Sequence, residues 1–96
     1  MIKVNKTDNI ITICGHANSA EYGKDIVCAS ASSIIYTTLN ALKRINQDSV
    51  DVIDNKDMTI KVLGSDEITL SLVDNMMELL KELEKDYPKN INVKEN

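Results

Sequence analysis

The chain has 96 residues, enough for one small domain with a single hydrophobic core but not for a second domain. Its composition, 43% hydrophobic and 27% charged, is that of an ordinary globular protein. The net charge of -4, with a single arginine at Arg44, argues against direct binding of nucleic acid, because nucleic-acid binders usually present a basic face. A negatively charged protein is better suited to a basic protein partner.

The N-terminal sequence MIKVNK lacks the apolar core of a secretory signal. The longest uncharged run, residues 26–42, contains five Ser or Thr residues and one Asn, so it is too polar for a membrane span. We therefore expect a cytoplasmic protein without membrane contact, whose two cysteines are free thiols.

The first two predicted elements form a β-hairpin. Residues 1–5 and 10–15 are short apolar runs rich in β-branched residues, and the turn-prone sequence NKTDN separates them. The second run contains IITIC, which is apolar on both faces of a strand, so this strand is expected at the centre of the sheet. Residues 16–24 follow without periodicity and are predicted to form a loop.

The middle of the chain predicts a helix and a second hairpin. Asp25 is a favoured N-cap residue, and the segment after it is rich in Ala, Ser and Leu, which predicts a helix to about Asn46. Residues 50–54 and 58–63 then alternate apolar and polar side chains on either side of Asn55-Lys56-Asp57. This is the pattern of two antiparallel strands joined by a short turn.

Gly64-Ser65-Asp66 introduces a long amphipathic helix that ends at Tyr87, before Pro88. Steps of three or four residues predict one apolar stripe, made of Ile68, Leu72, Met76, Leu79, Leu83 and Tyr87. We interpret the stretch that holds Met76-Met77 and Leu79-Leu80 as core first and as a dimer contact second. Residues 89–94 alternate again and predict a last strand. The order ββαββαβ predicts a single α+β domain over residues 1–96, a mainly antiparallel sheet with two packed helices.

The only histidine and one of the two cysteines carry the candidate chemistry. His16 follows Gly15 at the end of the predicted central strand, and the loop returns the chain to Cys28, in the first turn of a helix capped by Asp25. Unpaired N–H groups and the positive end of the helix dipole there would favour a thiolate and bind an oxyanion. With Cys28 as nucleophile and His16 as base, the reaction class is acyl transfer, most simply peptide hydrolysis.

Other interpretations of these residues stay open. A small Cys in a helix rich in Ala and Ser is often structural, and a lone His at a strand end is often only exposed. Cys14, His16 and Cys28 could form part of a metal site, but zinc usually takes four ligands and the chain has no C-x-x-C motif or second His. A redox pair of Cys14 and Cys28 is disfavoured in the cytoplasm. We interpret Cys14 as a packing residue of the strand and expect no metal or cofactor.

The segment from Gly15 to Ser32 resembles the ribosomal-processing cysteine protease family, called Prp. The family pattern is a GHA motif, a short flexible loop, and G-x-D-I-V-C-[AS]-x-x-S. In this chain it reads Gly15-His16-Ala17, then Glu21-Tyr22-Gly23, then Asp25-Ile26-Val27-Cys28-Ala29 and Ser32. The length and the order of elements agree with the family over nearly the whole chain. Ser30 and Cys14 depart from the commonest pattern, and neither is a catalytic position.

The resemblance implies a protease that removes a short N-terminal extension from large-subunit ribosomal protein L-twenty-seven. It implies that Cys28 is the nucleophile and His16 the general base, and it places the family's motif Asp and Ser at Asp25 and Ser32. It also implies a homodimer, and a mobile loop, residues 17–24 here, that admits the substrate. A second hypothesis, from another class, is a non-catalytic ribosome-associated binding module on the same fold.

The supporting polar residues of the motif each have two interpretations. Asp25 either caps the helix or orients His16. Ser32 lies one turn after Cys28 and either supports the site or bonds a backbone carbonyl, as Ser within a helix often does.

The residues around the loop also have two interpretations. Gly15 and Gly23 suit either a close backbone approach or loop freedom. Glu21 and Tyr22 either face the substrate or belong to the surface of the loop. These residues complete the predicted site.

Overall fold

The computed structural model describes residues 1–15 and 22–96, and side chains over residues 1–15 and 26–96. The strands are β1 (Ile2–Thr7), β2 (Ile10–Cys14), β3 (Val50–Asp54), β4 (Met58–Val62) and β5 (Ile91–Glu95). The helices are α1 (Tyr22–Ile45) and α2 (Glu67–Asp86), with a short 3-10 turn at Gln47–Ser49. The predicted order ββαββαβ and the α+β class are confirmed.

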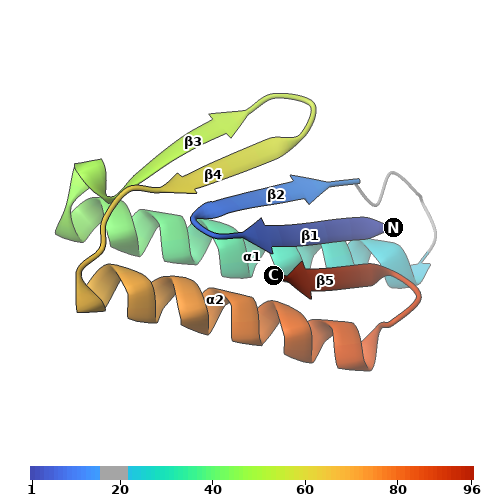
Figure 1. Cartoon of the computed structure of the whole chain (residues 1–96). Helices are drawn as coiled ribbons and strands as arrows, with labels where there is room; N and C mark the ends of the chain where they lie inside the picture. Colours follow the sequence, from blue (N-terminus) through green and yellow to red (C-terminus); the bar gives the residue numbers. More distant parts are fainter. Residues whose placement is uncertain (16–21) are drawn as a thin grey trace.

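The five strands form one sheet in the order β3-β4-β2-β1-β5. Neighbouring strands are antiparallel except β1 and β5, which are parallel. Strand β2 lies at the centre, as its apolar residues on both faces predict. Both helices pack on the same face of the sheet and run in opposite directions (Figure 1).

The first hairpin is tighter than predicted. Strand β1 continues to Thr7, which pairs with Ile10, so the turn contains only Asp8 and Asn9. Asp8 has a φ of 55°, in the left-handed region that Asp and Asn tolerate and that two-residue hairpin turns require. The last strand also differs from its prediction, because it begins at Ile91 rather than at residue 89.

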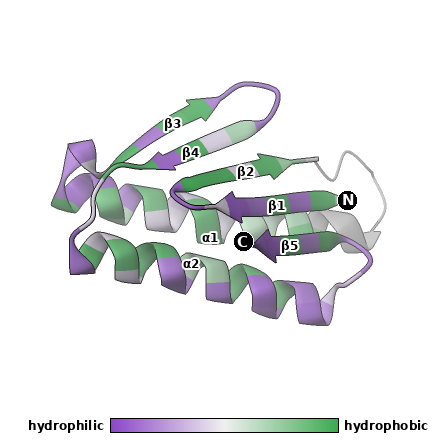
Figure 2. Cartoon of the chain, in the orientation of Figure 1, coloured by the Kyte–Doolittle hydropathy of each residue, from purple (hydrophilic) through white to green (hydrophobic). Residues whose placement is uncertain are grey.

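The core lies between the sheet and the two helices and is built almost wholly from aliphatic side chains, as the scarcity of aromatic residues requires. Apolar residues recur along the strands and both helices, with polar residues between them (Figure 2). The side chains with the least exposure come from both helices and from every strand except β3: Val4, Ile11, Val27, Leu42, Ile60, Met76, Met77, Leu80 and Ile91.

Helix α1 begins at Tyr22, three residues before Asp25, so the predicted N-cap role of Asp25 is wrong. The predicted loop over residues 16–24 is wrong at its end for the same reason, since Tyr22 and Gly23 belong to the helix. A glycine within a helix costs only about 1 kcal/mol relative to Ala. The core packing of the following turns, beginning at Val27, outweighs that cost.

Helix α2 begins and ends where the sequence predicts. The Asp66 carboxylate caps it by accepting hydrogen bonds from the Thr69 N–H (3.1 Å) and the Thr69 hydroxyl (2.8 Å). These hydrogen bonds hold the pKa of Asp66 below its ordinary value. Tyr87 is the C-cap, directly before Pro88, which has no N–H to continue the helix.

The face that α2 buries differs from the predicted stripe. Its buried residues are Thr69, Val73, Met76, Met77 and Leu80, whereas Ile68 is 56% exposed and Leu79 is 38% exposed. The interpretation as core is thus confirmed for Met76, Met77 and Leu80 and wrong for Leu79, and Ile68 lies on the stripe but outside the core. Apolar residues cover more than one flank of this helix, so the spacing alone does not fix which flank meets the sheet.

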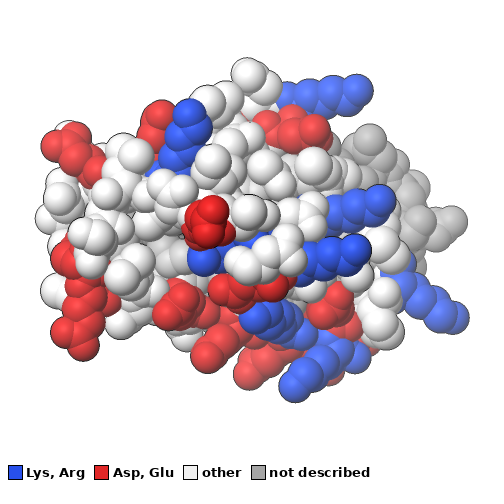
Figure 3. Space-filling view, viewed as in Figure 1, with Lys and Arg blue, Asp and Glu red and all other residues white. Residues whose placement is uncertain are grey.

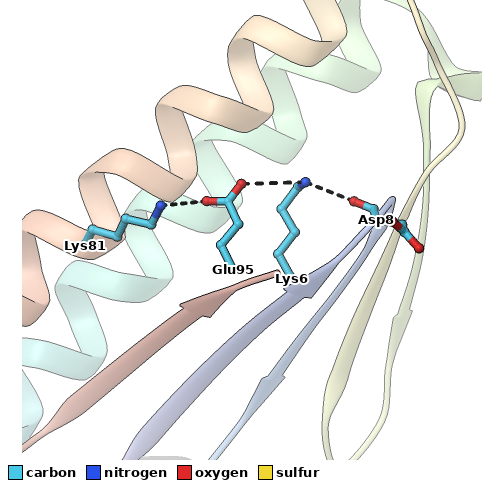
Figure 4. A network of polar contacts seen from close by, with 4 residues as sticks. All are labelled: Lys6, Asp8, Lys81 and Glu95. Atoms are coloured by element: carbon cyan, nitrogen blue, oxygen red, sulfur yellow. Dashed lines mark hydrogen bonds and ion pairs between the residues drawn. The ribbon is translucent and has the colours of Figure 1, made fainter.

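A small polar network joins the C-terminal strand to its two neighbours (Figure 4). Lys81 of α2 donates a hydrogen bond to Glu95 Oε1 (2.6 Å), and Lys6 Nζ of β1 lies 3.7 Å from Glu95 Oε2. Lys6 also donates to the backbone carbonyl of Asp8 (2.9 Å). The hydrogen bond from Lys81 and the charges of both lysines lower the pKa of Glu95 below its ordinary value.

Candidate functional site

The candidate site is a small groove between α1 and the strands β2, β3 and β4, with a volume of about 70 Å³. Its polar lining on α1 consists of Cys28, Ser32 and Tyr36, and Asp54 at the end of β3 lies across from them. Cys14 at the end of β2 and Gly15 just after it also line the groove, and five apolar side chains complete the wall: Ile2, Ile13, Ala31, Ile35 and Met58. Residues from both halves of the chain thus meet at one place.

Cys28 lies in the second turn of α1, because the helix begins six residues earlier. Its side chain is half-buried, packs against the core and also lines the groove. A thiol in this position is held by a rigid element and remains open to a molecule in the groove.

The early start of α1 also corrects the predicted oxyanion site. The unpaired N–H groups of a helix are those of its first four residues, here 22–25, so the N–H of Cys28 is used within the helix. The effect of the helix dipole falls off within the first turn. The prediction that Cys28 lies in that turn beside free N–H groups is therefore wrong.

Ser32 lines the same groove one turn after Cys28, on the same side of α1. The shared groove places the two motif residues side by side, as their spacing of four residues predicts. The side chain of Ser32 is half-buried.

Gly15 occupies a conformation that other residues rarely adopt. Its φ is +81°, and a Cβ at this position would overlap the backbone carbonyl oxygen of Met1. The glycine of the GHA motif is therefore required by a close approach of two backbone segments at the end of β2. This favours close approach over loop freedom among the two interpretations of Gly15.

Several predicted site residues lie outside the described part of the structure. These are His16 and Glu21, and the side chains of Tyr22 and Asp25. The backbone of residues 22–25, Gly23 included, is helical.

The polar pair at the far end of the groove was missed in the sequence. The Tyr36 hydroxyl donates a hydrogen bond to Asp54 Oδ2 (2.9 Å), and this bond to the carboxylate raises the pKa of Tyr36 above its ordinary value. The only sequence signal is that Tyr36 follows Cys28 and Ser32 at steps of four residues, which places each side chain about 40° around the helix from the one before. Nothing in the local sequence pairs it with a strand end 18 residues away.

Both cysteines are free thiols. Cys14 lies opposite Lys3 in the sheet and is half-buried. Its burial raises the pKa of the thiol, and the neighbouring Asp57 carboxylate raises it further. Within residues 1–15 and 26–96, no group of three or more His, Cys, Asp or Glu side chains is arranged to hold a metal ion.

A larger cavity, of about 310 Å³, lies between the β1–β2 turn and the start of α2. Lys6, Leu70 and Asp74 line it, and none of the motif residues does. Acidic and basic side chains are interspersed on the face of the molecule shown in Figure 3. In the described part of the chain, neither helix has the length and hydrophobicity needed to cross a bilayer.

The structure is similar to solved structures of known proteins. It matches the ribosomal processing protease Prp from S. aureus, solved in complex with a substrate peptide, with a TM-score of 0.84 at 22% identity, over 99% of this chain and 97% of that one. It matches SMU.848 from Streptococcus mutans with a TM-score of 0.85 at 25% identity, over 98% of this chain and 90% of that one. These similarities establish the fold.

Sequence comparisons identify the family. The chain is 32% identical over 82 residues to the ribosomal processing cysteine protease Prp of Staphylococcus aureus, covering 80% of this chain and 76% of that protein. It is 41% identical over 56 residues to the protein of the same name in Mycoplasma genitalium, covering 58% of this chain and 54% of that protein. The family described as cysteine protease Prp matches residues 1–92. With the motif residues Cys28 and Ser32 in one groove, the chain therefore belongs to the Prp family of cysteine proteases.

Proposed function

We propose that this protein is an endopeptidase that removes an N-terminal extension from large-subunit ribosomal protein L-twenty-seven, with Cys28 as nucleophile and His16 as general base. The observation that carries the proposal is the placement of Cys28. The one thiol within the family motif lines an open groove, in a chain that matches the cysteine protease family over residues 1–92. Two relatives are named as ribosomal processing proteases, which supports a ribosomal protein as the substrate.

The proposed reaction proceeds in two stages. The His16 imidazole takes the proton of Cys28, and the sulfur attacks the carbonyl carbon of the scissile peptide bond to form a tetrahedral oxyanion. The C–N bond then breaks, the amine leaves with the proton from His16, and a thioester remains on Cys28. Water, deprotonated by His16, hydrolyses the thioester and restores the thiol. No net oxidation or reduction occurs, so the reaction needs no further reactant.

Three residues are proposed to support the dyad. We propose that the Asp25 carboxylate orients the His16 imidazole, a role that the start of α1 at Tyr22, three residues earlier, supports. Ser32, in the groove beside Cys28, is proposed to support the site through its hydroxyl. Gly15 is proposed to hold the end of β2 in the backbone conformation that directs the chain into His16.

The substrate contacts predicted near the start of α1 are kept as proposals. Glu21, Tyr22 and Gly23 are proposed to face the peptide. The helical backbone at Tyr22 and Gly23 makes this segment the first turn of α1 rather than part of a loop.

The test is a cleavage assay with the L-twenty-seven precursor of the same organism, with products weighed by mass spectrometry. We expect one clipped N-terminal peptide, and its loss in both Cys28→Ala and His16→Ala. Cys14→Ala is the matched control, since it removes the other thiol and is expected to leave cleavage intact. Circular dichroism confirms that each variant is folded.

Intact precursor after incubation with the folded, reduced wild-type protein would overturn the proposal. Binding of the precursor without cleavage, unchanged in Cys28→Ala, would instead establish a non-catalytic ribosome-associated binding module. A product that persists in Cys28→Ala would show that another residue carries the chemistry.

We also propose a cytoplasmic homodimer, on the family resemblance. A cytoplasmic location fits a substrate that belongs to the ribosome. The support for self-association in the structure is the exposure of large apolar residues on α2, Ile68 and Leu79 among them.

A further inference from the structure

The groove extends well beyond Cys28. Along α1 it is lined by Cys28, Ser32 and Tyr36, and Tyr36 bonds Asp54 at its far end. Tyr36 follows Cys28 by eight positions of the helix, a rise of about 12 Å. An extended peptide advances about 3.3 Å per residue, so a peptide held at Cys28 reaches the Tyr36–Asp54 pair after about three or four residues.

The backbone of β3 is open at the same end of the groove. Strand β3 is at the edge of the sheet. Its hydrogen bonds to β4 alternate along the strand. The bonds from Leu63 N–H to Ser49 O (2.8 Å) and from Asn55 N–H to Asp57 O (3.3 Å), at the two ends of the pair, show which residues of β3 bond β4. By that alternation Asp51 and Ile53 bond β4, while the N–H and C=O of Asp54 point away from it. An extended peptide that reaches Asp54 thus meets a strand edge whose outward backbone groups pair with no other strand of the described residues.

The side chains at this end of the groove present acceptors of hydrogen bonds. The only proton of the Tyr36 hydroxyl is donated to Asp54 Oδ2, so the phenolic oxygen is left with its lone pairs. The second carboxylate oxygen of Asp54 is an acceptor as well, and the carboxylate carries a negative charge. Both side chains are exposed, Tyr36 to 46%. The group that complements them is a cation with several N–H donors.

We propose that Tyr36 and Asp54 form a specificity subsite that binds a Lys or Arg side chain three or four residues from the scissile bond. The inference rests on the proposed protease function and adds a sequence requirement to it. The carboxylate of Asp54 supplies the charge, and the ring of Tyr36 offers a face for the cation. The net charge of the chain, -4, favours the approach of a basic peptide.

The test uses a set of peptides that contain the cleavage sequence of the precursor. Lys and its neutral isostere norleucine are placed in turn at the third and fourth positions on either side of the scissile bond. The measurement is the ratio of kcat/KM for the Lys peptide to that for the norleucine peptide. We expect a ratio of about two to five at one position, the range of a solvent-exposed ion pair, and a smaller ratio in 0.5 M salt.

Two variants locate the source of the preference. Asp54→Asn, which removes the charge and keeps the shape, is expected to bring the ratio to about one. Asp51→Asn is the matched control, because it removes the same charge from the same strand on the opposite face of the sheet, and it is expected to keep the wild-type ratio. Tyr36→Phe leaves the charge in place and is expected to give an intermediate ratio.

The outcomes separate this subsite from the proposed protease function. If the wild-type protein cleaves none of the peptides and not the precursor either, the protease function itself fails. If it cleaves them with a ratio near one at all four positions, the protease stands and the subsite is wrong. A preference that survives in Asp54→Asn, or disappears equally in Asp51→Asn, also overturns the subsite.

Discussion

At the scale of single residues, Gly15 shows how the motif is tied to the fold. Gly15 follows the central strand and precedes His16. Its φ is in the left-handed region, and the carbonyl oxygen of Met1 occupies the position where a Cβ would be. A residue with a Cβ meets two penalties there, because the left-handed region costs about 1–2 kcal/mol and the overlap with Met1 adds to it. The glycine of the motif therefore has a structural reason independent of catalysis.

We predict that Gly15→Ala lowers the free energy of unfolding by at least about 2 kcal/mol, from the left-handed strain and the overlap together. Urea denaturation followed by circular dichroism measures this change. Lys3→Ala is a suitable control at the same end of the sheet, because Lys3 is exposed. Its replacement is expected to change the free energy of unfolding by less than about 0.5 kcal/mol. Equal urea midpoints for Gly15→Ala and the wild type would contradict the prediction.

At the scale of elements, the sequence predicted types and order better than contacts. The bounds of β3 agree with the predicted residues 50–54, since regular alternation and turn residues are local signals. The start of α1 at Tyr22 was missed because the core packing of the later turns extends the helix through Gly23. The pairing of Tyr36 with Asp54, the parallel pairing of β1 with β5 and the buried flank of α2 depend on tertiary packing, which no local pattern encodes.

The last strand offers a test of a contact between elements. Glu95 joins β5 to α2 and β1 through Lys81 and Lys6, and these contacts depress its pKa in the folded protein below the ordinary value of 4.5. A depressed pKa stabilises the folded state above the unfolded pKa, and this contribution is lost as the pH falls through the folded pKa. The Glu95 side chain is 29% exposed, so solvent screening limits the contribution to about 1 kcal/mol or less.

We predict that Glu95→Gln is slightly less stable than the wild type at pH 7, and that the difference shrinks as the pH falls below 4.5 through the lowered pKa of Glu95 in the folded protein. The measurement is the unfolding midpoint in urea at a series of pH values. Glu82→Gln, an exposed change on α2, serves as the comparison. A stability difference for Glu95→Gln that does not shrink as the carboxylate becomes protonated would show that the carboxylate charge is not its origin.

At the scale of the whole molecule, one flank of α2, beside its buried face, exposes apolar side chains that the packing of a single chain does not explain. Ile68, Leu72 and Leu79 lie within about 40° of one another around the helix axis. Ile68 and Leu79 are exposed and Leu72 is only partly buried. Exposed apolar residues that share one flank of a helix are the usual form of a helix contact between subunits. The part of the predicted stripe that is exposed, around Ile68 and Leu79, is thus the surface that we assign to the proposed homodimer.

We predict that the protein sediments at twice its chain mass of 10.7 kDa at micromolar concentrations, and that the double variant Ile68→Lys/Leu79→Lys sediments as a monomer. Two lysines facing each other across a two-fold axis would repel, and each would replace an apolar contact. Leu70→Lys is the matched control, because Leu70 is also exposed but lies about 160° away from Ile68 around the helix. A monomeric wild type would refute the dimer. A dimer that survives in the double variant would place its interface on another surface. One such surface is the groove at Cys28, on the side of α1 that faces the β3 edge. The next experiment would then test whether the second copy covers this groove.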